Sequence, residues 1–310
     1  KLALVRNHEL SPGSEAKGPA GNDPVLEARL AAATPFDRGQ GGRVLPGGTT
    51  TLVLDARGEK VLRQHLSLAG TSTNWAGGVT PWGSWLTCEE TVVAAPRTGT
   101  SHGWVFEVPA AATGLVTPVP LKAMGRFRHE AAAVDPRTGI VYQTEDHGEG
   151  LFYRFIPKVP GKLAEGGRLQ ALGFVDGHRD SRNWSGADFA PRSVRAVRWI
   201  DLTDVESPND DLRDRGHAAG AVRFARGEGI HLARRPRGGV EFFFTCTSGG
   251  AGRYGQIVRY VPSPAEGRPG EVKRPGRLEL FHESTDARLM DYADNLTVAL
   301  FQHDTNRNQE

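Results

Sequence analysis

Two apolar runs and the glycine-rich segment between them decide the fold class. The runs are Val240-Glu-Phe-Phe-Phe-Thr-Cys246 and Gln256-Ile-Val-Arg-Tyr260, and the segment that joins them contains Thr247-Ser-Gly-Gly-Ala-Gly252. Each run has the length of a strand and is rich in β-branched and aromatic residues, and no helical pattern follows the glycines. The stretch therefore predicts a β-hairpin with Cys246 in the core.

Runs of the same kind recur along the chain, each closed by Gly, Pro, Asp or Asn. They include residues 2–5, 51–54, 104–108, 139–142 and 151–155. Only residues 23–33 and 193–202 offer candidate helices, so the predicted fold class is all-β. Since a four-stranded propeller blade takes about 40–50 residues, the length suits about six blades. A sandwich or a double barrel is the competing arrangement.

We expect a single β-propeller domain over residues 1–310, incomplete at its C-terminus. Residues 161–215 are rich in Arg, Asp and Gly and poor in strand patterning, which predicts a loop-rich insertion or a small subdomain. Residues 299–310 form an atypical tail. Cys88 and Cys246 lie far apart in the sequence and allow one disulfide at most, which is no disulfide framework.

Composition excludes several classes of protein. The chain has 38 basic and 36 acidic residues, a net charge of +2, and this balance argues against a nucleic-acid-binding protein. No run of 18 apolar residues is long enough to span a membrane. His-Glu-x-x-His and paired Cys-x-x-Cys motifs are absent, which argues against zinc, and neither a Gly-x-Ser-x-Gly elbow nor a Walker loop occurs. The first residues carry no signal peptide and no initiating Met, so we expect a leader to have been removed before Lys1.

The densest group of reactive side chains ends a Gly- and Trp-rich segment over residues 70–91 with Cys88-Glu89-Glu90. Neighbouring carboxylates raise the pKa of a thiol and make it a poor nucleophile, whereas a bound metal deprotonates it. The simple alternative is a buried core cysteine followed by two solvated glutamates, and composition alone leaves both interpretations open.

Other carboxylates also lie at predicted strand ends. They are Glu9, Glu130, Glu145 with Asp146, Glu228, and Asp294. Singly, each is a solvated or ion-paired loop acid by default. In a propeller, strand ends from every blade converge on one axis, where only cations could relieve the repulsion among so many acids. Carboxylate oxygens suit calcium, and a lone thiolate suits a softer transition metal.

Asn74 and Arg226 are the best neutral and cationic groups near these acids. The guanidinium of Arg226 could bind a phosphate or a carboxylate through two parallel hydrogen bonds. A salt bridge to Glu228 is an equally good interpretation, because residues two apart in a strand share a face.

At these positions the chain resembles the PhoX-type alkaline phosphatases, a family of iron–calcium phosphatases, in its shorter branch. The matching segments are Arg6-Asn-His-Glu9, Gly47-Gly-Thr-Thr-Thr-Leu52, Thr80-Pro-Trp-Gly followed by Leu86-Thr-Cys-Glu-Glu90, Gly125-Arg-Phe-Arg-His-Glu-Ala131, Thr144-Glu-Asp146, Arg226-Gly-Glu228, Phe244-Thr-Cys-Thr-Ser-Gly249 and Asp294-Asn-Leu296. The chain departs from the family pattern at Trp75 and beyond Val298.

The resemblance implies a six-bladed β-propeller with iron and calcium on its axis. By position, Cys88 resembles the iron ligand, and the carboxylate ligands implied are Glu9, Glu89, Glu90, Glu130, Glu145 and Glu228. Asn74 and Arg226 resemble the groups that hold phosphate oxygens. Members of the family are commonly exported, so the expected location is periplasmic or extracellular.

We therefore predict a metal-dependent phosphomonoesterase that acts on small-molecule phosphate esters as a monomer. A calcium-dependent propeller lactonase or esterase is the first alternative, but it leaves Cys88 without a role. The second is a non-catalytic propeller that metal ions stabilise.

Overall fold

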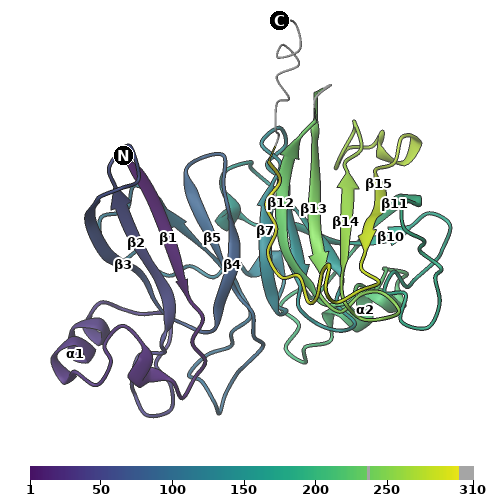
Figure 1. Cartoon of the computed structure of the whole chain (residues 1–310). Helices are drawn as coiled ribbons and strands as arrows, with labels where there is room; N and C mark the ends of the chain where they lie inside the picture. Colours follow the sequence, from purple (N-terminus) through teal and green to yellow (C-terminus); the bar gives the residue numbers. More distant parts are fainter. Residues whose placement is uncertain (236–237, 300–310) are drawn as a thin grey trace, which may run out of the picture.

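Antiparallel strands dominate the structure. The computed structural model describes residues 1–235 and 238–299, and the fifteen strands in this part of the chain form three sheets of three, nine and three strands (Figure 1). The predicted all-β class is confirmed. Six separate blades remain a prediction, because hydrogen bonds join many of the strands into the nine-stranded sheet.

The two small sheets come from the first 109 residues. β1 (Leu2–His8), β2 (Gly47–Leu54) and β3 (Val61–Thr71) form one, and β4 (Asn74–Val79), β5 (Ser84–Glu89) and β6 (Val105–Pro109) form the other. Asn7 of β1 links them, because its Nδ2 donates to the Ala76 carbonyl at 2.6 Å and its Oδ1 accepts from the Thr87 hydroxyl at 2.9 Å.

The nine-stranded sheet has the strand order β12-β13-β14-β15-β11-β10-β9-β8-β7. Its members are β7 (His129–Val134), β8 (Val141–Glu145), β9 (Phe152–Pro157), β10 (Gly167–Phe174), β11 (Val194–Asp201), β12 (Gly227–Arg234), β13 (Val240–Cys246), β14 (Gln256–Val261) and β15 (Arg277–Glu283). β11 pairs with both β10 and β15 and so joins two antiparallel groups. The two edge strands, β7 and β12, pack against each other, and β4 packs against β7. Three strands from distant parts of the sequence, β4, β7 and β12, thus pack side by side, and we call this contact region the seam.

Two glycines allow β4 to approach its neighbours closely. A Cβ added to Gly78 would lie 1.8 Å from the carbonyl oxygen of Ala132 in β7, and one added to Gly77 would lie 1.9 Å from that of Leu86 in β5. Any other residue would push β4 away from β7. Gly78 therefore sets the distance between β4 and β7, and Gly77 sets the distance between β4 and β5.

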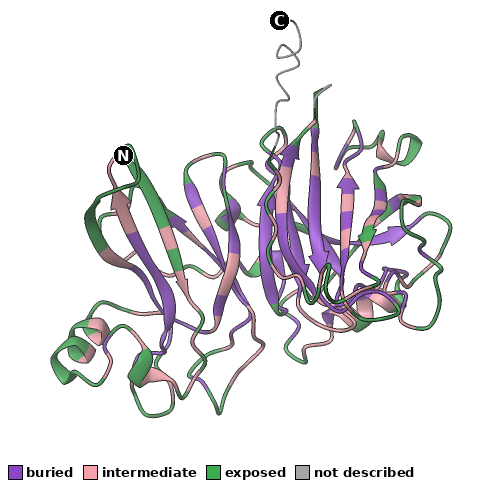
Figure 2. Ribbon diagram, viewed as in Figure 1, coloured by how far each residue is buried: buried purple, intermediate pink, exposed green. Residues whose placement is uncertain are grey.

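Aromatic side chains fill the core of the nine-stranded sheet. The rings of Phe152 and Phe244 stack with centroids 4.4 Å apart, and Tyr142 lies 4.4 Å from Phe242. Figure 2 shows that β7, β12 and β13 are largely buried, whereas the outer part of β1 is exposed. Both cysteines are buried and free, so no disulfide joins Cys88 to Cys246.

Helices are short and peripheral. α1 (Pro24–Ala32) begins at Asp23, whose side chain accepts from the amides of Val25 and Leu26, and α2 (Leu212–Ala218) follows β11. Four 3₁₀ turns cover Glu15–Lys17, Lys122–Met124, Leu163–Glu165 and Glu271–Lys273. Among the described residues, no helix combines the length and the apolar character needed to cross a bilayer.

Most local predictions are confirmed, and one is wrong. The hairpin of residues 240–260 is β13–β14, and residues 23–33 contain α1. Residues 193–202, predicted as a helix, form β11, because pairing on both sides with β10 and β15 overrides the local pattern. β10 and β11 also show that the stretch 161–215, predicted as an insertion, supplies two strands to the large sheet. All but residue 299 of the predicted tail, 299–310, lies outside the described residues.

Candidate metal centre

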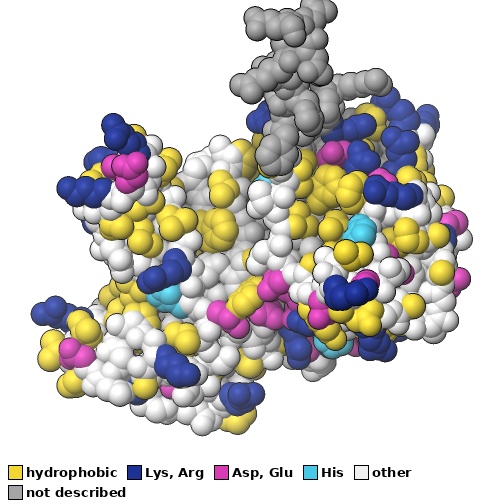
Figure 3. Space-filling view, viewed as in Figure 1, with side chains coloured by type: hydrophobic (Ala, Val, Ile, Leu, Met, Phe, Trp, Pro, Cys, Tyr) yellow, Lys and Arg dark blue, Asp and Glu magenta, His cyan; other side chains and the backbone are white. Residues whose placement is uncertain are grey.

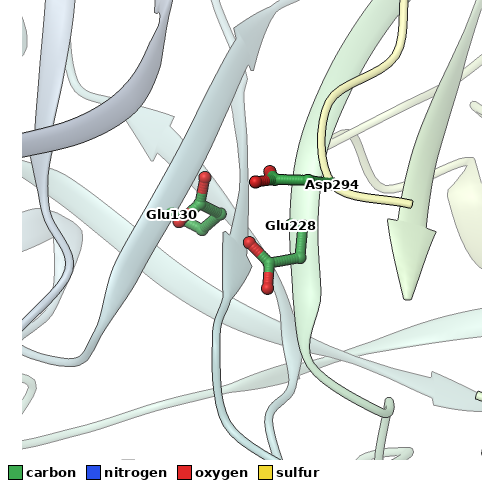
Figure 4. Close-up of side chains that lie close together, drawn as sticks. All are labelled: Glu130, Glu228 and Asp294. Atoms are coloured by element: carbon green, nitrogen blue, oxygen red, sulfur yellow. The ribbon is translucent and has the colours of Figure 1, made fainter. Parts of the chain in front are cut away.

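Three carboxylates meet at the seam between β7 and β12. Glu130 comes from β7, Glu228 from β12 and Asp294 from the segment after β15, and one oxygen of each lies within 4.8 Å of the others. Their carboxylates point toward one another (Figure 4). In the space-filling view, acidic side chains gather near the middle of the face of the molecule that is shown (Figure 3). The Asp294 carbonyl accepts from the Gly229 amide at 3.2 Å, which holds this segment against β12.

Glu130 has the most unusual environment of the three. Its side chain is fully buried, and neither carboxylate oxygen has a hydrogen-bond partner among the described residues. Burial, followed by the charges of Glu228 and other neighbouring acids, raises the pKa of Glu130 well above its usual range. A buried carboxylate without partners holds a proton or faces a cation.

The pKa values of the neighbouring acids are raised as well. Burial raises the pKa of Glu228 to about 8, with Asp146 as the next cause. Burial, then a hydrogen bond and the charge of Asp146, raise the pKa of Glu90 to about 9. The pKa of Glu9, at the outer edge of the group, is raised by burial and by the charge of Asp294. These acids therefore form one interacting cluster that lacks enough positive charge.

Arg226 is the cation bound to this cluster. Its Nε and Nη2 donate to the two oxygens of Asp146 at 2.7 and 2.9 Å, and Nη2 also donates to Glu228 at 2.8 Å. Although burial opposes it, this pairing lowers the pKa of Asp146. Arg226 has a left-handed backbone with φ of 58°, and its amide donates to the His147 carbonyl. The Arg226 side chain remains 38% exposed, so the residue is accessible from solvent.

Cys88 lies in β5, fully buried and packed in a core cluster with Leu86 and Val105. Burial raises the pKa of its thiol well above the usual value, and the charge of Glu130 raises it further. Among the described residues, the group of atoms within 4.8 Å of one another comprises the three carboxylates and does not include this sulfur, which interacts with the group through the charge of Glu130. Without a cation the sulfur is a neutral thiol, and with one it is a ligand.

Glu89 points away from the cluster. Its carboxylate accepts from the amides of Ser72 at 2.9 Å, Gly103 at 2.8 Å and Trp104 at 3.1 Å, and one oxygen lies 2.7 Å from Nδ1 of His102. Successive side chains of a strand point to opposite faces, so Cys88 and Glu90 face the acids and Glu89 does not. The carboxylate that the resemblance assigns to a metal is therefore fully used by hydrogen bonds.

Only one oxygen of Glu145 accepts hydrogen bonds, and Oε1 has no hydrogen-bond partner among the described residues. Its Oε2 accepts from the Leu151 amide at 3.0 Å and from the Tyr153 hydroxyl at 2.7 Å, and its Oε1 lies 3.6 Å from Arg213. Burial raises its pKa to about 7. The next residue, Asp146, faces the cluster instead. The structure thus brings Asp146, and not the predicted Glu145, to Arg226.

Asn74 has no free amide group. Its Oδ1 accepts from the Thr71 hydroxyl at 2.5 Å and its Nδ2 donates to the Thr87 hydroxyl at 3.0 Å, and the side chain is fully buried. In this structure the amide holds β3, β4 and β5 together at the start of β4.

Comparisons with known proteins identify the family of this chain. The family model of alkaline phosphatase PhoX matches residues 35–302. This chain belongs to the PhoX alkaline phosphatase family. A solved structure, Pseudomonas fluorescens PhoX in complex with vanadate, a transition state analogue, is similar with a TM-score of 0.52 and 22% identity. The match covers 75% of this chain and 54% of that one, so the present chain spans about half the length of its solved relative. No match is found among curated proteins.

Sequence reasoning missed one group in this PhoX family member. His102 lies between Glu89 and Asp37, with Nε2 2.9 Å from Asp37, and all three side chains are buried. Burial alone would lower the pKa of His102, but the two carboxylates outweigh burial and raise it to about 9. Asp37 and His102 are 65 residues apart, so no local spacing could have joined them.

Proposed function

We propose that this PhoX family member is an exported, metal-dependent phosphomonoesterase whose iron and calcium site is the acid cluster. The observation that carries the proposal is Glu130, a buried carboxylate with no partner that faces Glu228 and Asp294. Its location in the periplasm or outside the cell, and its six-bladed propeller, follow from the resemblance and are part of the proposal.

The side chains present fit the implied metals. Glu130, Glu228 and Asp294 offer hard oxygens that suit calcium, with Glu90 and Glu9 at the margin of the same cluster. The thiol of Cys88 suits iron, since thiolate is a softer ligand. When bound, such ions supply Lewis-acid polarisation of a phosphoryl group. Glu89 is left out of this ligand set because both of its oxygens accept hydrogen bonds. Glu145 is left out because its carboxylate lies beside Tyr153 and Arg213.

Arg226 would hold the phosphate ester. Two of its nitrogens are bound to Asp146 and Glu228, whereas Nη1 makes no hydrogen bond to the described residues. The two-point contact with Asp146 fixes the plane of the guanidinium, so Nη1 is directed before a substrate arrives. A fixed donor stabilises the charge that develops on phosphoryl oxygens during transfer. Asn74 is fully buried and bonded to Thr71 and Thr87, so it would reach a substrate only after a local rearrangement.

The test is phosphate release from 4-nitrophenyl phosphate by protein supplied with iron and calcium. We expect hydrolysis, and we expect replacement of Cys88 by Ala to abolish iron binding and hydrolysis together. A lactonase would survive that replacement, and a non-catalytic propeller would hydrolyse no ester at all. Purified protein that takes up no iron and releases no phosphate would refute the proposal.

A further inference from the structure

The Asp37–His102–Glu89 network, defined by these three side chains, lies behind the strand end that carries Cys88 and Glu90. Both ring nitrogens of His102 contact a carboxylate, at 2.7 Å to Glu89 and 2.9 Å to Asp37. His102 is fully buried, as is Glu89, and only 7% of Asp37 is exposed. No step of the proposed reaction uses these groups.

The network connects three separate segments of the chain. Asp37 also accepts from the amides of Gly99 at 2.9 Å and Thr100 at 3.0 Å, and the His102 carbonyl accepts from Nε of Arg126 at 2.8 Å. Glu89 accepts from the amides of Gly103 and Trp104 and from that of Ser72. The network thereby anchors the end of β5 to the loop that precedes β6 and to the loop around Asp37.

We propose that His102 is a positioning residue, which holds Glu89 on the outer face of β5 and so directs Cys88 and Glu90 toward the acid cluster. This inference rests on the proposed role of Cys88 and Glu90 at the metal site. The alternation of the strand supplies the mechanism for Cys88: as long as Glu89 is fixed on one face of β5, Cys88 must face the other. Glu90 follows the last residue of β5, so fixing Glu89 also fixes the backbone from which Glu90 extends. An imidazolium between two carboxylates is well suited to this, because removing it leaves Glu89 and Asp37 as buried acids with amide donors but without the cation between them.

The test compares His102→Gln with His282→Gln, an exposed histidine on β15, in metal-free protein well below its unfolding temperature. The first readout is the rate at which a thiol reagent modifies Cys88, and buried Cys246 serves as the internal control for global unfolding. We expect His102→Gln to raise the rate at Cys88 about tenfold or more while Cys246 stays unreactive, because only the end of β5 is released. Equal reactivity of both thiols, or of neither, would overturn the inference.

The second readout is calcium affinity measured by calorimetry. His102→Gln should weaken binding about tenfold, and Glu89→Gln should weaken it less, because the glutamine oxygen can still accept from the amides of Gly103 and Trp104. Loss of calcium binding in Glu89→Gln as complete as in Glu130→Gln would show that Glu89 is itself a ligand and would refute the positioning role. Failure of the phosphatase proposal would appear separately, as absence of iron and hydrolysis in the wild-type protein, and would leave the thiol readout intact.

Discussion

Calcium binding by metal-free protein should release protons, and the raised pKa values of the buried carboxyl groups determine how many. Without a cation, the pKa values of Glu90 and Glu228 are about 9 and about 8, and that of Glu130 lies well above its usual range. At pH 7 the first two are about 99% and about 90% protonated, and all three must ionise to bind a cation. We therefore expect about two to three protons released per protein at pH 7, and well under one from Glu90 and Glu228 together at pH 10.

The assay is isothermal titration with calcium in buffers that differ in ionisation enthalpy. The observed enthalpy should change with the buffer in proportion to the number of protons released. Glu130→Gln should bind calcium weakly and release fewer protons. Glu165→Gln, which alters an exposed acid paired with Lys162, should behave like the wild-type protein. Tight binding with no dependence on the buffer would mean that the acids are already ionised, and the reasoning from burial would be wrong.

Three further predictions concern stability and activity. The ion pairs of His102 contribute stability that is fully present below pH 6.5 and is lost as the pH rises through about 9. The free energy of unfolding in urea should therefore decline less steeply between these pH values in His102→Gln than in the wild-type protein. An unchanged slope would contradict the ion pairing. Arg226→Lys should lower kcat/KM for 4-nitrophenyl phosphate about 10²-fold, because lysine lacks the two-point fork, whereas Arg288→Lys, at an exposed site, should not. Gly78→Ala should destabilise the protein by about 2–4 kcal/mol, and Gly114→Ala, with nothing within 4 Å of the new Cβ, by less than about 1 kcal/mol; equal thermal shifts would refute the close packing of β4 on β7.

The strands could be predicted because their signals are local. The hairpin of residues 240–260 has two strand-like runs with a glycine-rich turn between them, and it forms β13–β14 as expected. Residues 193–202 have no comparable turn signals beside them, and one of their two pairing partners, β15, is remote in sequence. Long-range pairing decides such a segment, so local pattern alone misassigned it.

In two places the sequence could not decide which of two adjacent acids faces the cluster. In Cys88-Glu89-Glu90 and in Glu145-Asp146, adjacent acids point to opposite faces, and only the structure shows which of each pair faces the cluster. The sequence alone does not show which acid of each pair faces the cluster, because both are carboxylates that could ionise. His102 could not be found at all, since its two partners come from distant segments.

The central claim is that cations bind between Glu130, Glu228 and Asp294, beside the sulfur of Cys88. The most direct measurement is anomalous diffraction from crystals of the protein loaded with iron and calcium, collected on both sides of the iron absorption edge. We predict a calcium peak among the three carboxylates and an iron peak bonded to the Cys88 sulfur. Ions bound only elsewhere, with the three carboxylates left facing one another, would contradict the account.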